Sequence, residues 1–292
     1  MLVLLQVVAV AAFAPLVQGS MKRLRANLQG RPGPSPFQPY RDLAKLWAKE
    51  ALQPKGISPL PLIAPGVVLG VALTFAAALP LVAAPGGLDP VVDIIALAFL
   101  LALGRFLLAL AALDTRSAFA GMAASREMTF ASLVEPTLLL ALLGGAMLGG
   151  GTKLSLLLTA PFGLAAALAF AAFFLVLLAE TARIPIDNQE THYELTMIHE
   201  GLVLEYSGWQ LAMLQFAEQV RQLSFFVLAA ILLPGGAAWW MHLPWIIVLV
   251  GAIGVTETMF AKLRLFEVPQ VLTTAFILAA TSIVLRVLGM PV

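Results

Sequence analysis

Long apolar runs constrain this chain more than any other feature of its sequence. Several of them reach about 17 to 25 residues, which is enough for a helix to cross a hydrocarbon core about 30 Å thick. Only helices or closed barrels satisfy their backbone polar groups inside a bilayer, and continuous apolar runs without alternation favour helices. The eight candidate spans are roughly 1–18, 60–82, 90–112, 133–150, 154–179, 215–233, 243–258 and 270–288.

The composition supports the same fold class. Hydrophobic residues make up 61% of the 292 residues and charged residues 11%, whereas a soluble domain is about half apolar. We therefore predict an all-α, polytopic membrane protein that forms a single domain over residues 1–292. The chain has no cysteine, so it forms no disulfide and holds no thiolate-bound metal or iron–sulfur cluster. Any redox centre must belong to a partner.

The basic residues are strongly asymmetric along the predicted topology. Fourteen of the 17 Lys and Arg residues lie in the connections 19–59, 113–132, 180–221 and 259–269. By the positive-inside rule these connections are cytoplasmic, so both termini lie outside and the protein belongs to the cytoplasmic (inner) membrane. Lys22, Arg23 and Arg25 directly follow the first span and no positive charge precedes it, which is typical of a retained anchor rather than a cleaved signal.

The first connection contains a predicted surface helix. A cluster of Pro and Gly over residues 31–39 breaks any preceding helix, and an amphipathic pattern follows it. Its apolar and basic positions are Leu43, Leu46 and Trp47, and Arg41, Lys45 and Lys49, respectively. Such a helix lies at the headgroups of the bilayer, where it can bind anionic lipid or form part of a docking surface for a soluble partner. The two roles are compatible.

The segment 180–208 concentrates carboxylates between two apolar runs. It holds six of the 16 Asp and Glu residues, mixed with apolar residues that call for burial. Glu190 and Glu194 stand four apart and would share one helical face, where like charges repel unless a cation intervenes or one group is protonated. Arg183, His192 and His199 are the local candidates to pair with them. An ordinary ion-paired loop is the alternative.

Charged residues within or near the spans are few, and each needs a buried partner or water. At the centre of a span a charge costs about 2.5 to 3.5 kcal/mol. Arg105 has more than a helical turn of apolar sequence on both sides, whereas Glu257 and Arg286 can also extend towards the interface. The full set is Asp93, Arg105, Glu135, Glu218, Arg221, Glu257 and Arg286.

The stretch "ETARIPIDNQETHYELTMIHEGLVLEYSG" resembles a family signature. It is similar to that of the membrane subunit shared by respiratory complex I (NADH-quinone oxidoreductase) and energy-converting group 4 [NiFe]-hydrogenases, including formate hydrogenlyase subunit 4 and hydrogenase-4 component C. The matching positions are Glu180, Thr181, Arg183, Pro185, Asp187, Glu190, Glu194, Glu205, Tyr206, Ser207 and Gly208. The spacing from Glu194 to Glu205 and the loop Asp114 to Glu127 resemble the hydrogenase branch.

The resemblance implies a membrane anchor for a soluble hydrogenase arm. The expected partners are the large [NiFe] subunit, the small iron–sulfur subunit, antiporter-like membrane subunits and the lipid bilayer, with no nucleic acid. The [NiFe] centre and iron–sulfur clusters would lie in those partners, and this chain would hold no cofactor, no metal and no catalytic residue. The predicted ion-coupling residues are Arg105, Asp114, Glu127, Glu135, Glu190, Glu194, Glu200 and Glu205. The predicted docking residues are Arg126, Arg183, Pro185 and Asp187, with Arg126 and Arg183 also as counter-charges.

Three alternatives remain open at this stage. The chain could be a quinone-binding subunit of complex I, which would require a chamber for the quinone headgroup. An independent secondary transporter is disfavoured, because no pair of spans interrupted by Gly or Pro occurs at matching positions in two halves. The last alternative is a related complex with a metal-free large subunit. Coupling ion, electron donor and direction of the hydrogen chemistry are not encoded in these motifs.

Overall fold

The computed structural model describes residues 2–52, 56, 58–79, 93–147, 151–159, 161–188, 197–234 and 239–288. These residues form helices and contain no strand beyond one isolated bridge between Asp93 and Lys153. The helices are α1 (Leu2–Leu28), α2 (Gln38–Trp47), α3 (Leu60–Ala78), α4 (Ile94–Asp114), α5 (Ala118–Ala146), α6 (Leu156–Thr159), α7 (Leu164–Glu180), α8 (His199–Val203), α9 (Gly208–Ile231), η2 (Trp239–Met241), α10 (His242–Met259) and α11 (Val268–Val287). The predicted polytopic helical membrane protein is confirmed.

The predicted number of eight spans is not confirmed. Six described helices are long and apolar enough to cross a membrane, namely α1, α3, α4, α5, α10 and α11. The run 154–179, predicted as one span, is divided into α6 and the 17-residue α7, with Pro161 and Gly163 between them. The run 215–233 belongs to α9, which starts earlier, at Gly208, and carries Glu218 and Arg221.

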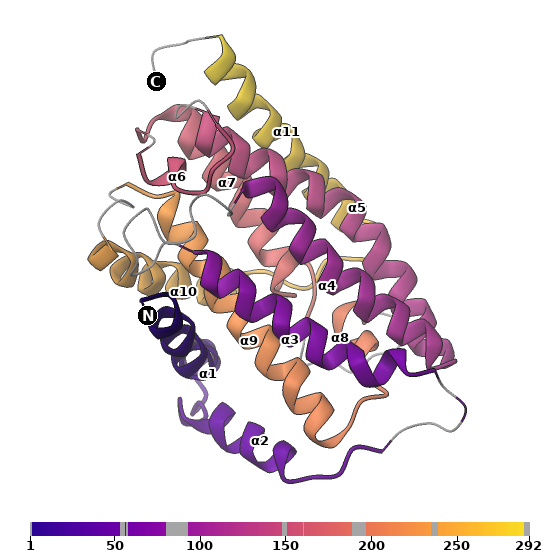
Figure 1. Cartoon of the computed structure of the whole chain (residues 1–292). Helices are drawn as coiled ribbons and strands as arrows, with labels where there is room; N and C mark the ends of the chain where they lie inside the picture. Colours follow the sequence, from indigo (N-terminus) through magenta and orange to yellow (C-terminus); the bar gives the residue numbers. More distant parts are fainter. Residues whose placement is uncertain are drawn as a thin grey trace.

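The helices pack as two groups joined through the centre of the molecule (Figure 1). Helices α5, α7 and α11 pack on one another, while α9 packs against α1, α3 and α10. Helix α4 contacts both α3 and α5 and so links the groups on one side. Helix α9 is the most enclosed, since every residue from Gln222 to Ile231 is buried. Its apolar half therefore lies inside protein rather than against lipid.

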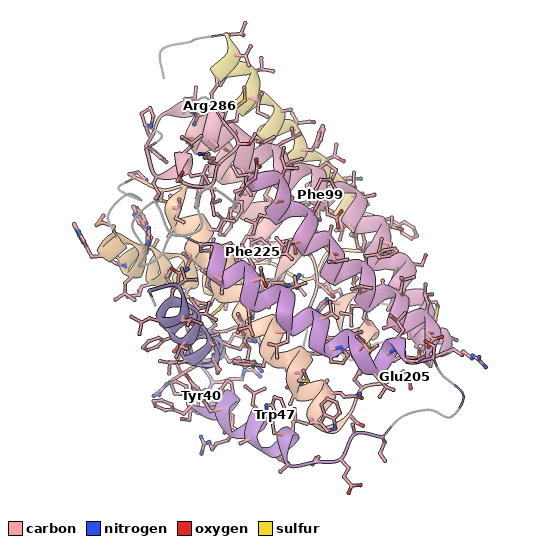
Figure 2. The ribbon with its side chains drawn as sticks, in the orientation of Figure 1. Tyr40, Trp47, Phe99, Glu205, Phe225 and Arg286 are labelled. Carbon is pink, nitrogen blue, oxygen red and sulfur yellow. The ribbon has the colours of Figure 1, made fainter. Side chains whose placement is uncertain are left out.

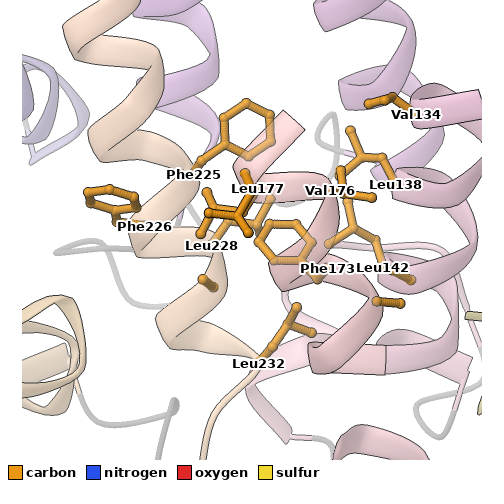
Figure 3. Close-up of a cluster of buried hydrophobic side chains, with 14 of the residues drawn as sticks. Val134, Leu138, Leu142, Phe173, Val176, Leu177, Phe225, Phe226, Leu228 and Leu232 are labelled. Atoms are coloured by element: carbon orange, nitrogen blue, oxygen red, sulfur yellow. The ribbon is translucent and has the colours of Figure 1, made fainter. Parts of the chain in front are cut away.

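Aromatic side chains fill the contact between the two groups (Figure 3). The ring of Phe225 on α9 packs edge-on against Phe75 of α3, with centroids 5.1 Å apart, and against Phe173 of α7 at 6.3 Å. Lipid is as apolar as these side chains, so close packing holds the helices together more than removal from water does. This packing fixes α3, α7 and α9 relative to one another.

The predicted surface helix is present as α2. It packs against α1 and α9 and buries Pro39 and Leu43, while Trp47 is 49% exposed and Tyr40 lies along the same helix (Figure 2). The chain after α2 is tied to the start of α9, because Ser207 Oγ accepts a hydrogen bond of 2.8 Å from Leu52 N. The amphipathic pattern was correct, although Trp47 faces outward.

Gly208 shows why the last residue of the Glu-Tyr-Ser-Gly motif has no side chain. It begins α9 with a φ of 54°, in the left-handed region that favours glycine. A Cβ atom at this position would lie 2.3 Å from the carbonyl oxygen of Glu50. The motif therefore allows the chain that follows α2 to approach the first turn of α9 directly.

One charged residue singled out in the spans has a local structural role. Asp93 precedes α4, and its Oδ1 accepts a hydrogen bond of 2.8 Å from Ile95 N, which caps the helix. Its Oδ2 accepts a hydrogen bond of 2.5 Å from the Thr152 hydroxyl. These contacts account for a carboxylate at the end of an apolar run.

Candidate functional site

The chain that leaves α7 forms a tight turn over residues 181–188, called here the α7 turn. The amide of Asp187 donates to the carbonyl of Arg183 at 3.1 Å, which closes the turn on itself. The amide of Leu263, between α10 and α11, donates to the carbonyl of Pro185 at 2.8 Å. The turn is thus fixed both locally and by the connection between the last two helices.

Glu180, the last residue of α7, bridges two arginines from other helices. Its Oε1 accepts a hydrogen bond from Arg105 Nη2 on α4, and its Oε2 lies 3.0 Å from Arg221 Nη1 on α9. Arg221 Nη2 also donates to the carbonyl oxygen of Glu180 at 2.8 Å. Glu180 is only 3% exposed, and the negative end of the α7 dipole disfavours its charge. The two guanidinium groups offset that cost.

Arg105 connects Glu180 to two further carboxylates on α5. Its Nε lies 3.2 Å from Glu127 Oε1, and its Nη1 lies 3.0 Å from Glu135 Oε1. The Arg105 side chain is 7% exposed, whereas that of Glu135 is 35% exposed. Arg105 therefore satisfies its charge with three carboxylates from two helices, and Glu135 is the most accessible member of the group.

On the other side of Glu180 the contacts continue through α9 to α8. Arg221 Nη2 lies 2.6 Å from Glu218 Oε2, and His199 Nε2 lies 3.5 Å from the same oxygen. Burial opposes a charge on the imidazole, but the charge of Glu218, its hydrogen bond and the charge of Glu127 raise the pKa of His199 to about 9. His199 is therefore an imidazolium at neutral pH.

These contacts form one continuous chain of charges, called here the ion-pair network. It links four helices and the end of a fifth, and it alternates acids with bases over most of its length. Its members are Glu127, Glu135, Arg105, Glu180, Arg221, Glu218 and His199.

A second cluster lies beside the ion-pair network, around the α7 turn. Arg183 Nη1 lies 3.2 Å from Glu257 Oε1 on α10, and Arg183 Nη2 donates to Gln18 on α1. Asp187 receives Lys262 Nζ at 2.7 Å, and its Oδ2 accepts a hydrogen bond of 3.3 Å from the amide of His199. Since His199 also contacts Glu218, this residue joins the cluster to the network.

A cavity of about 480 Å³ lies against both groups of charges. Its polar lining includes Arg105, Glu127, Glu218 and Arg221, together with side chains of the second cluster. Residues of α3, α4 and α9 supply an apolar wall. No group of three or more His, Asp and Glu side chains in the described ranges is placed to hold a metal ion. The cavity is suited to water or to an amphiphilic molecule.

Three predicted site residues lie near the network without being shown to join it. Asp114 Oδ2 accepts a hydrogen bond of 2.9 Å from Ser58 N and so fixes the approach to α3. Arg126 Nη1 donates to the carbonyl of Met197 at 3.0 Å, just before α8. Glu200 is half-buried on α8 and lines the cavity.

The three remaining predicted carboxylates belong to the motif itself. Glu205 is half-buried between α8 and α9 (Figure 2). Glu190 and Glu194, on which the sequence argument for a shared proton rested, fall outside the described residues, and their role stays a sequence-based prediction.

Several members of the ion-pair network and of the second cluster were not predicted as site residues. Glu180 was recognised only as part of the motif, and Glu218, Arg221 and Glu257 only as charges in apolar runs. The signal was present, because an ionisable residue inside a span calls for a buried partner. The contact of Arg105 with Glu180, 75 positions apart, was not encoded in any local pattern.

A family model described as NADH dehydrogenase matches residues 1–288. The chain belongs to this family. Hydrogenase-4 component C of Escherichia coli (strain K12) is 37% identical over 243 residues, which cover 80% of this chain and 76% of that protein. Formate hydrogenlyase subunit 4 of the same strain is 36% identical over 231 residues, which cover 75% of this chain and 73% of that protein.

The complex I branch of the family is more distant. An NADH-quinone oxidoreductase subunit of Geobacillus thermodenitrificans (strain NG80-2) is 31% identical over 250 residues, covering 80% of this chain and 73% of that protein. A solved structure titled as the membrane-bound sulfane sulfur reductase, an archaeal respiratory membrane complex, matches 97% of both chains with a TM-score of 0.81 and 19% identity. It shows the same fold. The resemblance inferred from the motif is confirmed.

Proposed function

We propose that this chain is the membrane subunit of a hydrogenase complex of the formate hydrogenlyase kind, where it anchors the soluble subunits and couples their redox reaction to ion movement. The ion-pair network carries this proposal. It is a continuous set of charges that includes Glu180, directly before the α7 turn, and extends to α4, α5, α8 and α9. The higher identity to the two hydrogenase-type relatives supports the choice of branch.

The geometry of the network suits charge transmission. Buried charges are weakly screened, so a change of protonation at one member alters the pKa of its neighbours. Glu180 contacts both arginines at once, and each arginine contacts a different set of carboxylates. A proton lost from His199 or gained by Glu218 would change the balance of charge at Arg221 and, through Glu180, at Arg105. In this proposal Glu190 and Glu194, in the motif, would extend the ion-pair network.

The docking role rests on the α7 turn and the neighbouring connections. Arg183 and Asp187 are 5% and 3% exposed, so they hold the turn in shape rather than face a partner. Pro185 is half-buried, and Arg126 reaches the backbone before α8. In this proposal the surface formed by the α7 turn and the neighbouring connections lies on the cytoplasmic side. It binds the large [NiFe] and small iron–sulfur subunits. Antiporter-like subunits would contact the chain within the membrane.

Purification and transport assays test the proposal together. The complex is isolated in mild detergent through a tag on this chain, and its subunits and nickel content are measured. Membrane vesicles then report hydrogenase turnover with an artificial electron carrier and, separately, ion movement linked to the physiological reaction. Glu218→Gln should lower ion movement at least about tenfold while turnover with the artificial carrier persists. Glu50→Gln, an exposed acid outside the network, is the matched control.

Two results would contradict the proposal. One is a tagged complex that contains neither hydrogenase-type subunits nor nickel. That result would favour the alternative of a related complex with a metal-free large subunit. The other is normal coupled ion movement in Glu218→Gln. The same assay applies to Glu190→Gln, Glu194→Gln and their double mutant, for which the sequence predicts the same loss.

The cavity favours one second candidate, a quinone-binding subunit of complex I. A headgroup chamber was the requirement of that alternative, and the cavity of about 480 Å³ has both a polar lining and an apolar wall. Quinone-dependent oxidation by the purified complex separates the two. Activity that requires added quinone, with no hydrogen evolved or consumed, would favour this candidate.

A further inference from the structure

The opening of the cavity is marked by exposed basic side chains from two elements. Lys22 comes from α1, Lys45 from α2 and Lys49 from the residues after α2, and all three line the cavity while remaining exposed. Arg25 lines the same side, near Glu257 at 3.9 Å. These four residues are called here the basic opening. The buried network lies deeper in the same cavity.

The three lysines of the basic opening lack acidic partners in the described part of the chain. None of them has an ion pair there, and Asp42, the one acid beside them in the cavity lining, is hydrogen-bonded to Gln38 Nε2 at 2.8 Å. Three neighbouring ammonium groups repel one another unless an anion lies between them. The opening is therefore suited to an anionic ligand.

The position of α2 indicates where that ligand comes from. Phe37, Trp47 and Leu52 on and beside this helix are 61%, 49% and 74% exposed, and the helix also carries the basic residues Arg41 and Lys45. Exposed aromatic and basic residues on an amphipathic helix are typical of the boundary between headgroups and acyl chains. The lysines then lie at the depth of lipid phosphates.

The wall behind the opening is apolar. Val68, Val71 and Ala72 of α3 and Leu211 and Leu214 of α9 line the cavity next to the basic side chains. A ligand that presents an anionic head to the lysines would thus find a surface for a hydrocarbon chain within the same cavity. A free inorganic anion would leave that wall unused.

We propose that the basic opening binds the headgroup of an anionic phospholipid, with one acyl chain against the apolar wall formed by α3 and α9. The headgroup phosphate lies between Lys22, Lys45 and Lys49 and offsets part of their mutual repulsion, and the lipid closes the cavity towards the bilayer. The lipid occupies the opening of the cavity and leaves the ion-pair network, part of which lines the same cavity, without a direct contact to the headgroup. The proposal does not depend on the identity of the redox partner.

Native mass spectrometry of the delipidated complex, titrated with phosphatidylglycerol and with phosphatidylcholine, tests the proposal. Lys22→Gln, Lys45→Gln and Lys49→Gln are combined in one variant. Each lysine near a membrane surface contributes about a fivefold change in affinity, so the combined variant should bind phosphatidylglycerol roughly a hundredfold more weakly. The control variant combines Arg23→Gln, Arg31→Gln and Arg41→Gln, which are exposed basic residues of the same region that do not line the cavity. Its affinity should change less than about threefold, because these side chains do not line the cavity and their charges are screened by solvent.

Several outcomes would overturn the proposal. Equal losses of phosphatidylglycerol affinity in the two variants would show general attraction to the basic surface rather than a specific site. An unchanged affinity in the lysine variant would show that the basic opening does not bind the lipid. Equal binding of phosphatidylcholine would remove the role of charge. Displacement of the lipid by an equal concentration of inorganic phosphate would identify a free anion as the ligand. If the triple variant fails to assemble, Lys45→Gln and Lys49→Gln alone should each weaken binding about fivefold.

Discussion

Replacing Glu180 by glutamine tests whether the ion-pair network holds the helices together. The substitution keeps the volume of the side chain and one acceptor oxygen but removes the charge that Arg105 and Arg221 share. The new amide would also point a donor at one of two guanidinium groups. Arg105 would keep two carboxylates and Arg221 would keep Glu218, so the network would be weakened rather than abolished.

The expected loss is large because the site is buried. Removing one partner of a buried ion pair costs about 3–5 kcal/mol, since it leaves uncompensated charge in a low-dielectric site. At about 2 °C per kcal/mol for a chain of this size, the thermal midpoint should fall by roughly 6–10 °C. Adding Arg221→Gln to Glu180→Gln should cost less than the sum of the two single changes, because the second substitution removes a cation that the first left in excess.

Thermal unfolding of the detergent-solubilised complex, followed by size-exclusion chromatography after heating, measures these midpoints. Glu50→Gln serves as the matched control, because Glu50 is exposed and lies outside the network; its midpoint should stay within about 1 °C of wild type. A Glu180→Gln midpoint within about 2 °C of wild type would refute the reasoning, as would strictly additive losses in the double mutant.

Three further predictions follow from single contacts. The folded pKa of His199 is raised from 6.5 to about 9, so its stabilising charge is fully present below about pH 6.5 and lost as pH rises through about 9; the thermal midpoint should fall over that range in wild type and stay flatter in His199→Gln. Gly208→Ala places a Cβ against the Glu50 carbonyl at a positive φ, and assembly measured by chromatography should fall sharply, whereas intact assembly would contradict the reading of the motif. Lys262→Ala removes the ion-pair partner of Asp187 and should loosen the α7 turn, seen as faster amide exchange there; unchanged exchange would show that the pair is dispensable.

The helical fold was predictable because its cause is local. Apolar runs of span length specify helices wherever they occur, and the amphipathic pattern of α2 was visible for the same reason. Errors arose where one run held two elements. Pro161 and Gly163 are helix-breaking residues inside the predicted span 154–179. Their presence in the sequence already favours a division of this run into two helices. The positions of helix ends, such as the start of α9 at Gly208, depend on contacts with residues that are distant in the sequence.

The candidate site was predictable only in part. The motif indicated the α7 turn, and the cost of charge in a span indicated Arg105 and Glu135, which do lie in contact. The pairing of Glu180 with two arginines depends on how α4, α7 and α9 cross, and packing between distant helices leaves no local trace in one sequence. Local spacing drew attention instead to Glu190 and Glu194, four residues apart, since neighbours along a helix are the pairs that a sequence makes visible.

The attachment of α2 to the start of α9 has a mechanical consequence. Gly208 touches the backbone of Glu50, and Ser207 is hydrogen-bonded to Leu52, so the surface helix and the first turn of α9 move as one piece. Glu218 lies ten residues along the same continuous helix, about 15 Å from that attachment. A helix transmits displacement along its axis with little compression. The amphipathic pattern of α2 predicts that it lies at the membrane surface. Bilayer thickness and lateral pressure acting there are therefore expected to change the spacing of charges in the ion-pair network.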